Sequence, residues 1–196
     1  MAAEMKLYLC TSDAADRRYC TVTRHGSPLS AALAQGRPIA PILEELQEDT
    51  VRLEIDEHEG GLGLPDLLGN ERNYLVLRRA CADALLPRFS AGPHESAPVT
   101  LINRKRRVHA DDYVVLNPLG KVDCLDAGRS EMSGDTRHPA VRIFGEFRLR
   151  PAAVPEDRDI FRVQGLLLGY VFSERVVEYI RQQRFTNFVF EPVQLS

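Results

Sequence analysis

The residues best suited to chemistry in this sequence are a histidine and two carboxylates that lie almost side by side. His109 stands in the segment HADDY, next to Asp111 and Asp112. A histidine near carboxylates can act as an oriented general base or bind a metal ion. No second histidine lies close by in the sequence to complete a ligand set, so we predict no metal and no cofactor. A small cytoplasmic enzyme with its site around these three residues remains the alternative function.

Neither the cysteines nor the glycines form a motif that would assign an activity. Cys10, Cys20, Cys81 and Cys124 are too far apart for a CxxC metal pair and too few for a disulfide framework in a chain of 196 residues. We expect them to be reduced thiols. The segment GGLGLPDLLGN, which begins at Gly60, lacks the Gly-Lys-Ser/Thr ending of a phosphate-binding loop. It predicts a turn.

Acidic charge is concentrated between residues 44 and 59, where eight carboxylates stand against one arginine. The acidic residues are Glu44, Glu45, Glu48, Asp49, Glu54, Asp56, Glu57 and Glu59. Such a segment is either a solvated face or a patch that binds a basic partner. In the second case, charge complementarity would speed and orient docking. We take these eight residues as the candidate partner-binding site.

Basic charge is concentrated in the run Arg104-Lys105-Arg106-Arg107, between two predicted strands. Four positive charges in a row could contact phosphate. The run lacks the interleaved aromatic side chains on which nucleic-acid bases stack. It therefore favours a solvated hairpin tip.

The composition is that of an ordinary folded protein. Hydrophobic residues make up 44% of the chain and charged residues 27%, which excludes disordered, collagen-like and coiled-coil classes. The net charge of −3 argues against a general affinity for nucleic acid or anionic lipid. No apolar run reaches the ~18 residues that cross a bilayer, and the N-terminus lacks a signal-peptide core. We expect a cytoplasmic protein.

The elements that would position these residues alternate between strands and helices. Strands are predicted over residues 6–10, 19–23, 51–55, 99–102, 113–116, 122–125, 141–149, 159–163 and 186–191. The first two would form a hairpin, and the three runs between residues 99 and 125 an antiparallel meander. Three prolines and two glycines predict a loop over residues 26–41, with at most one helical turn, and a second loop covers residues 90–98.

Two helices are expected, over residues 73–87 and 173–183, with Ser173 as the N-cap of the second. Both would cover one face of a sheet formed mainly from residues 99–191. The pattern predicts a single α+β domain with a mixed or mainly antiparallel sheet. Within it, residues 1–63 would supply N-terminal strands and loops to the same compact unit as residues 64–196.

The C-terminal third contains an ordered set of segments that is similar to a known family. The segments are DIFRV (159–163), VFSERVVEYI (171–180) and FTNFVFEPV (185–193), with YVVLNPL (113–119), VDCLD (122–126) and Ser130 upstream. Together they resemble a bacterial polymorphic-toxin immunity family, the immunity-MXAN type. The resemblance covers residues 64–193 and is clearest over residues 159–193.

The resemblance implies a small cytoplasmic protein, made beside a toxin gene, that binds the toxin and protects the producer or its kin. It implies no catalytic residues. The expected partner is a cognate toxin, for which a basic nuclease would suit the acidic residues. We expect neither direct nucleic-acid binding nor membrane binding, and the oligomeric state stays open.

Overall fold

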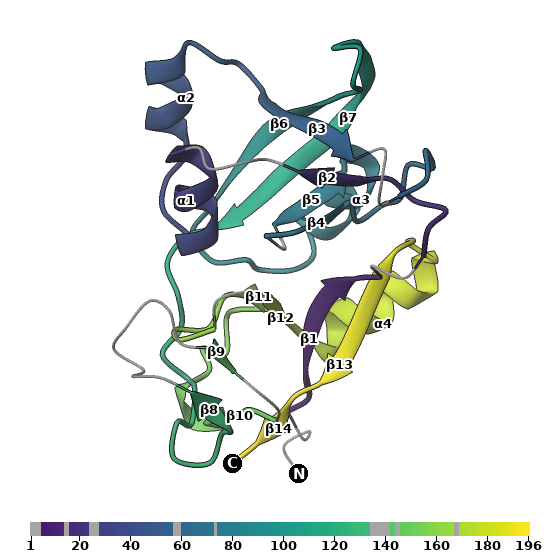
Figure 1. Cartoon of the computed structure of the whole chain (residues 1–196). Helices are drawn as coiled ribbons and strands as arrows, with labels where there is room; N and C mark the ends of the chain where they lie inside the picture. Colours follow the sequence, from purple (N-terminus) through teal and green to yellow (C-terminus); the bar gives the residue numbers. More distant parts are fainter. Residues whose placement is uncertain are drawn as a thin grey trace.

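Two β-sheets, one in the upper and one in the lower half of Figure 1, carry the architecture. The computed structural model describes residues 5–13, 16–23, 28–56, 60–72, 74–133, 142–143, 146–166 and 169–196. The upper sheet has six strands in the order β4 (Gly69–Asn70), β2 (Thr21–Thr23), β3 (Val51–Asp56), β6 (His94–Ile102), β7 (Val108–Pro118) and β5 (Leu75–Arg78). The lower sheet has four, in the order β11 (Ile160–Phe161), β12 (Tyr170–Ser173), β1 (Leu7–Ser12) and β13 (Phe188–Pro192).

Helices α1 (Pro28–Gln35) and α2 (Ala40–Leu46) cover one face of the six-stranded sheet (Figure 1). The alternation in β3 turns Val51, Leu53 and Ile55 toward these helices, where they pack in one core with Leu29 and Leu33. The prediction of a loop over residues 26–41 is therefore wrong where the two helices form. Their prolines occupy first-turn positions, where a helix needs no N–H donor.

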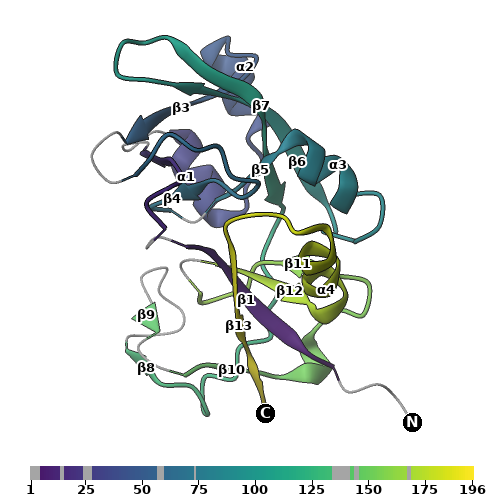
Figure 2. The ribbon, with the colours of Figure 1, turned by 90° about the vertical axis from the view of Figure 1, so that its right-hand side faces the viewer.

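A second core joins the two sheets. Helices α3 (Arg79–Leu85) and α4 (Glu174–Gln183) bury Leu85 and Ile180 in it, together with Leu116 from the upper sheet and Phe172 from the lower one. Figure 2 shows both helices on the same side of the molecule. The expectation that these helices cover one face of a single sheet is wrong, because the core that they share lies between two.

The helix predicted over residues 73–87 is wrong in its first part. Leu75, Val76 and Leu77 form strand β5, and the helix begins only at Arg79. All three side chains are buried, Val76 in the first core and Leu75 and Leu77 in the second. A strand that is buried on both faces has a continuous run of apolar residues. Such a run also contains the three- and four-residue spacing of a helix, so periodicity alone does not distinguish the two.

The N-terminal strand lies in the middle of the C-terminal sheet. β1 pairs antiparallel with β12 on one side and with β13 on the other. It does not pair with β2, so the hairpin expected between the first two strands is wrong. β2 and β3 pair instead with each other, and β3 pairs with β6.

A third core lies on the far side of the lower sheet. It contains Leu7, Cys124, Leu149 and Phe161. The remaining short strands are β10 (Arg148–Leu149) beside β14 (Gln194–Leu195), and β8 (Met132–Ser133) beside β9 (Arg142–Ile143), with a 3-10 turn, η1, at Pro151–Ala153.

The expected meander holds only for β6 and β7, which pair antiparallel. Residues 122–125 leave that sheet: Val122 bridges Val163 and Leu125 bridges Leu149. β6 begins already at His94, inside the segment expected to be a loop. Despite these differences the predicted class is confirmed, because mixed and antiparallel sheets with packed helices form a single α+β domain.

Candidate functional site

Helix α2 presents the first acidic residues to solvent. The N–H of Ile39, the residue before the helix, donates to Glu95 Oε2 at 2.6 Å and so ties the helix to β6. Leu43 is buried against the sheet. Glu44 and Glu45 are exposed as a result. Gln47 ends the helix with a φ of 53°.

The turn after α2 extends this acidic surface. Asp49 is exposed, and Glu48 is half-buried with its Oε2 shielded from solvent and not hydrogen-bonded to any described residue. In the sequence, Leu46 lies between Glu45 and Glu48, and its relative solvent exposure is 45%. We call Glu44, Glu45, Glu48 and Asp49 the α2 acidic group. Sequence reasoning missed Leu46, although an apolar residue among consecutive acids is visible in the sequence.

The acidic residues of β3 lie elsewhere. Glu54 and Asp56 alternate with the buried residues of the strand, which places them on the sheet face opposite α1 and α2. The structure thus divides the predicted site into the α2 acidic group and a β3 pair on the other face. Glu57 and Glu59 lie outside the described residues.

The basic run forms the tip of the β6–β7 hairpin, as expected. Asn103 closes the turn: its backbone N–H donates to Arg107 O, and its Oδ1 accepts the N–H groups of Lys105 and Arg107, each at 3.0 Å. The four basic residues are exposed. β3 runs parallel to β6, so Glu54 lies beside Ile102, immediately before this tip. Positive and negative charges therefore share this end of the sheet, whereas the α2 acidic group is purely acidic.

The three residues of the alternative enzyme site all lie on β7. Asp112 forms an ion pair with Arg78, with 2.8 Å between Oδ2 and Nε. Asp111 is exposed and His109 half-buried, and no hydrogen bond between described residues joins the histidine to either aspartate. Within the described parts of the chain, no group of three or more metal-binding side chains comes together. The structure thus brings the three onto one strand without connecting them.

The four cysteines are free and buried, as predicted for reduced thiols. Burial raises the pKa of the Cys20 thiol to about 11 and that of Cys124 to about 11. It raises the pKa values of Cys10 and Cys81 further. Because the thiolate is the nucleophile, these neutral thiols are not activated for attack.

The Gly-rich segment packs against backbone, as expected for a turn. The N–H of Gly61 donates to Tyr19 O at 2.9 Å, and that of Gly63 to Arg18 O at 3.0 Å. A Cβ on Gly61 would collide with the carbonyl oxygens of Arg17 and Arg18. Close approach of two backbone segments therefore accounts for the glycines.

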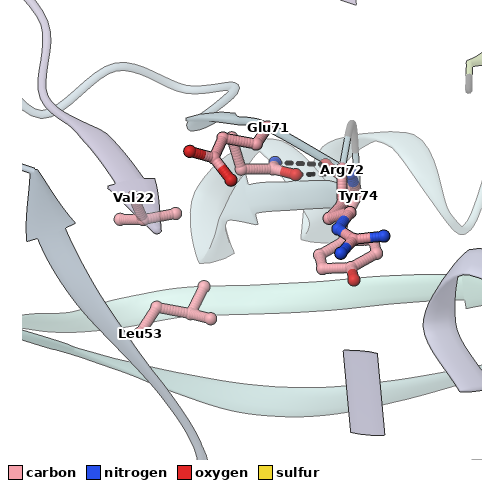
Figure 3. Close-up of a pocket in the computed structure, with 6 residues that line it drawn as sticks. Val22, Leu53, Glu71, Arg72 and Tyr74 are labelled. Atoms are coloured by element: carbon pink, nitrogen blue, oxygen red, sulfur yellow. Dashed lines mark hydrogen bonds between the residues drawn. The ribbon is translucent and has the colours of Figure 1, made fainter. Parts of the chain in front are cut away.

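A small cavity lies between β2, β3 and the turn after β4 (Figure 3). Val22 and Leu53 form its apolar wall, and Glu71, Arg72 and Tyr74 line the other side. The side chain of Asn70 closes the turn by accepting from Tyr74 N–H at 2.7 Å and donating to Tyr74 O at 2.9 Å. The cavity has a volume of about 10 Å³, which is room for about one water molecule. It is too small for a substrate.

A comparison with protein families matches residues 12–195 to the Immunity protein family (Imm11). The chain belongs to the Imm11 immunity protein family. The suspected resemblance is thereby confirmed. The Imm11 match also extends through β2 and β3, beyond the residues 64–193 on which the sequence resemblance rested. No curated protein matches the chain. None of the described helices of this Imm11 protein is long and apolar enough to cross a membrane.

Proposed function

We propose that this Imm11 protein binds a cognate bacterial toxin, delivered between competing cells, and neutralises it by forming a stoichiometric complex. The observation that carries the proposal is the family match over residues 12–195. The protein would act in the cytoplasm of the producing cell and would have no catalytic activity of its own. The ion pair between Asp112 and Arg78 supports a structural role for Asp112 rather than a catalytic one.

We further propose that the acidic residues contribute to recognition of a basic toxin, for which a nuclease is the natural candidate. The α2 acidic group supports this because it concentrates four carboxylates around an exposed leucine. Interfaces commonly combine an apolar contact with a polar rim. The β3 pair, Glu54 and Asp56, would meet the toxin only if it also reaches the other face of the sheet.

The experiment that tests the proposed function is co-expression with the toxin encoded by the neighbouring gene. Cells that carry both genes should survive, and the two proteins should copurify. An Imm11 protein that folds but neither copurifies with the toxin nor protects the cells would refute the proposal.

A variant separates binding from catalysis. His109→Ala combined with Asp111→Asn and Asp112→Asn removes the alternative enzyme site. The ion pair of Asp112 with Arg78 is solvent-exposed on both sides, so its loss costs about 0–1 kcal/mol and leaves the fold intact. We expect full protection. Loss of protection with normal folding and normal toxin binding would favour the enzyme.

A further inference from the structure

Strand β13 forms an open edge of the four-stranded sheet. β1 pairs with it on one side, from Tyr8 opposite Pro192 to Ser12 opposite Phe188. On its other side no strand among the described residues continues the sheet. Figure 1 shows β13 in yellow beside β1, with no strand drawn on its other side. An open edge presents unpaired backbone groups to any chain that approaches it.

The hydrogen-bond register identifies which backbone groups point outward. The N–H of Val193 donates to Leu7 O at 2.9 Å, so the residues that bond to β1 are 193, 191 and 189. The N–H of Glu174 donates to Lys6 O, which independently assigns the alternate residues of β1 to β12. Phe188 and Phe190 therefore direct both N–H and C=O away from β1, and Pro192 directs only a C=O.

The side chains next to these groups form a partly apolar shelf. The rings of Phe188 and Phe190 are stacked, with centroids 5.9 Å apart and an interplanar angle of 16°. The guanidinium of Arg181, from the last turn of α4, lies 5.9 Å from the rings of both Tyr8 and Phe190. We call Tyr8, Arg181, Phe188 and Phe190 the β13 shelf. Its three aromatic side chains are only half-buried.

Charge gives the shelf a preference for one kind of strand. Arg181 and Arg184 are exposed, and neither forms an ion pair with a described residue. An incoming strand with an acidic side chain would place a carboxylate beside Arg181. Its apolar side chains on the same face would pack against Phe188 and Phe190.

A second copy of the chain fits this edge poorly. Symmetric antiparallel pairing about Phe190 would oppose Phe188 to Pro192, which has no N–H to donate. It would also bring the two Arg181 side chains onto the same face near the symmetry axis, where like charges repel.

We propose that the outer edge of β13 receives an extended segment of the toxin, with apolar and acidic side chains on the face toward the β13 shelf, as a fifth strand of the sheet. This inference rests on the proposed function. The main-chain bonds at Phe188 and Phe190 would supply affinity, and the β13 shelf would select the side chains. The rest of the toxin would bind elsewhere on the molecule, so the short edge need not support the complex alone.

Amide hydrogen exchange tests the edge directly, using the full chain with and without the toxin domain encoded by the neighbouring gene. We expect exchange at the Phe188 and Phe190 amides to slow by at least about tenfold in the complex. The amides of Val189 and Glu191 are already bonded to β1 and serve as internal references. Unchanged exchange at Phe188 and Phe190 in a formed complex would overturn the inference and leave the proposed function standing. A toxin that does not bind the wild-type protein would overturn both.

Two pairs of variants test the same edge by affinity. Phe190→Pro and Phe190→Ala both remove the ring, but only proline also removes the outward N–H. We expect toxin affinity to fall about tenfold more for the proline variant. Arg181→Gln should weaken binding, whereas Lys105→Gln, the same charge change at the tip of the other sheet, should not. Equal affinities within each pair would contradict the proposal, as would dimers of the free protein that dissociate on Phe190→Pro.

Discussion

At the scale of single residues, Asp159 shows how a buried charge is compensated in this fold. Its side chain is 7% exposed and accepts hydrogen bonds from Arg175 at 2.7 Å, Ser173 Oγ at 2.6 Å and Ser90 N–H at 3.1 Å. The Ser173 hydroxyl is therefore not a helix cap: Ser173 precedes α4 but makes no capping bond. Ser173 holds the N-cap position, as predicted, but the capping bond expected from its side chain is missing, because its Oγ is directed to the Asp159 carboxylate instead of to an N–H group of the first turn.

This carboxylate makes stability depend on pH. Burial alone would raise the pKa of Asp159, but the bonds from Arg175, Ser173 and Ser90 outweigh it and hold the pKa below its ordinary value. A carboxyl with a lower pKa in the folded state contributes stability above the unfolded-state pKa of ~3.9. That contribution is lost as the pH falls through the folded-state pKa. We expect Asp159→Asn to destabilise the protein at pH 7 and to reduce the slope of unfolding free energy against pH below about 4. An unchanged slope would contradict this.

Gly61 illustrates a residue whose role is steric. A Cβ there would meet two backbone carbonyl oxygens, neither of which can rotate away as a side chain could. We expect Gly61→Ala to lower the free energy of unfolding by about 1–3 kcal/mol, measured by chemical denaturation. Gly128→Ala is the matched control, since its Cβ would meet only Asp126 Oδ1 at 3.6 Å. Equal stabilities of the two variants would refute the steric explanation.

At the scale of elements, the turn between α4 and β13 is held by the segment before β4. Asp66 Oδ2 accepts from Thr186 N–H at 2.7 Å and from Thr186 Oγ1 at 2.8 Å. Asn187 donates to Leu67 O at 2.7 Å, and Leu67 N–H donates to Thr186 O. These contacts attach β13 of the lower sheet to the chain that enters the upper one.

Removing this attachment should loosen β13 before the rest of the molecule. Asp66→Ala leaves the Thr186 N–H without its acceptor, which costs about 1–3 kcal/mol for a shielded donor. We expect a lower midpoint of thermal unfolding and faster amide exchange in residues 186–190. Thr186→Ser keeps the hydroxyl and should behave like the wild type. Exchange that quickens equally in β6 and β7 would show that the contact stabilises the whole fold rather than this element.

Elements with local patterns could be predicted from the sequence, and elements defined by distant partners could not. The alternation in residues 51–55 and the helical spacing in residues 174–183 each reflect one buried face, so β3 and α4 were expected. β5 is buried on two faces by cores that include residues more than ninety positions away, such as Phe172. Its neighbours decide its conformation, and they are not visible in a local window.

The prolines of α1 and α2 led to the wrong prediction of a loop over residues 26–41, for a related reason. A proline excludes a helix interior but is compatible with a first turn, and only the structure shows where that turn begins. The candidate site, too, could be predicted only in part. The acidic run was evident in the sequence, but its division between α2 and the opposite face of β3 depends on how the sheet is covered.

At the scale of the whole molecule, charge is unevenly distributed. The chain carries a net charge of −3, yet residues 44–59 alone carry eight of its 28 carboxylates. The basic tip lies beside the end of β3, so the α2 acidic group is the more uniform negative surface. A basic toxin approaching this group would be attracted before contact.

This attraction should appear in association rates. We expect Glu44→Gln, Glu45→Gln and Glu48→Gln together to slow toxin association at low salt, with a smaller effect on the dissociation rate. The difference from wild type should fade as the screening length falls from ~10 Å at 0.1 M to ~3 Å at 1 M salt. Stopped-flow measurements at both salt concentrations check this.

A control variant with the same change in charge isolates position from net charge. Asp83→Asn, Glu156→Gln and Asp157→Asn are exposed substitutions away from α2. Their association rates should stay close to that of the wild type. Equal slowing in both variants would attribute the effect to net charge and leave the α2 acidic group as a solvated surface.

The most direct test of the central claim is a titration of purified toxin activity with this Imm11 protein. Stoichiometric neutralisation predicts that activity falls linearly and reaches its minimum at one equivalent, at once and without further change in time. The triple variant of His109, Asp111 and Asp112 should give the same curve. Complete inactivation by far less than one equivalent, progressing with time, would contradict the claim and identify an enzyme that modifies the toxin.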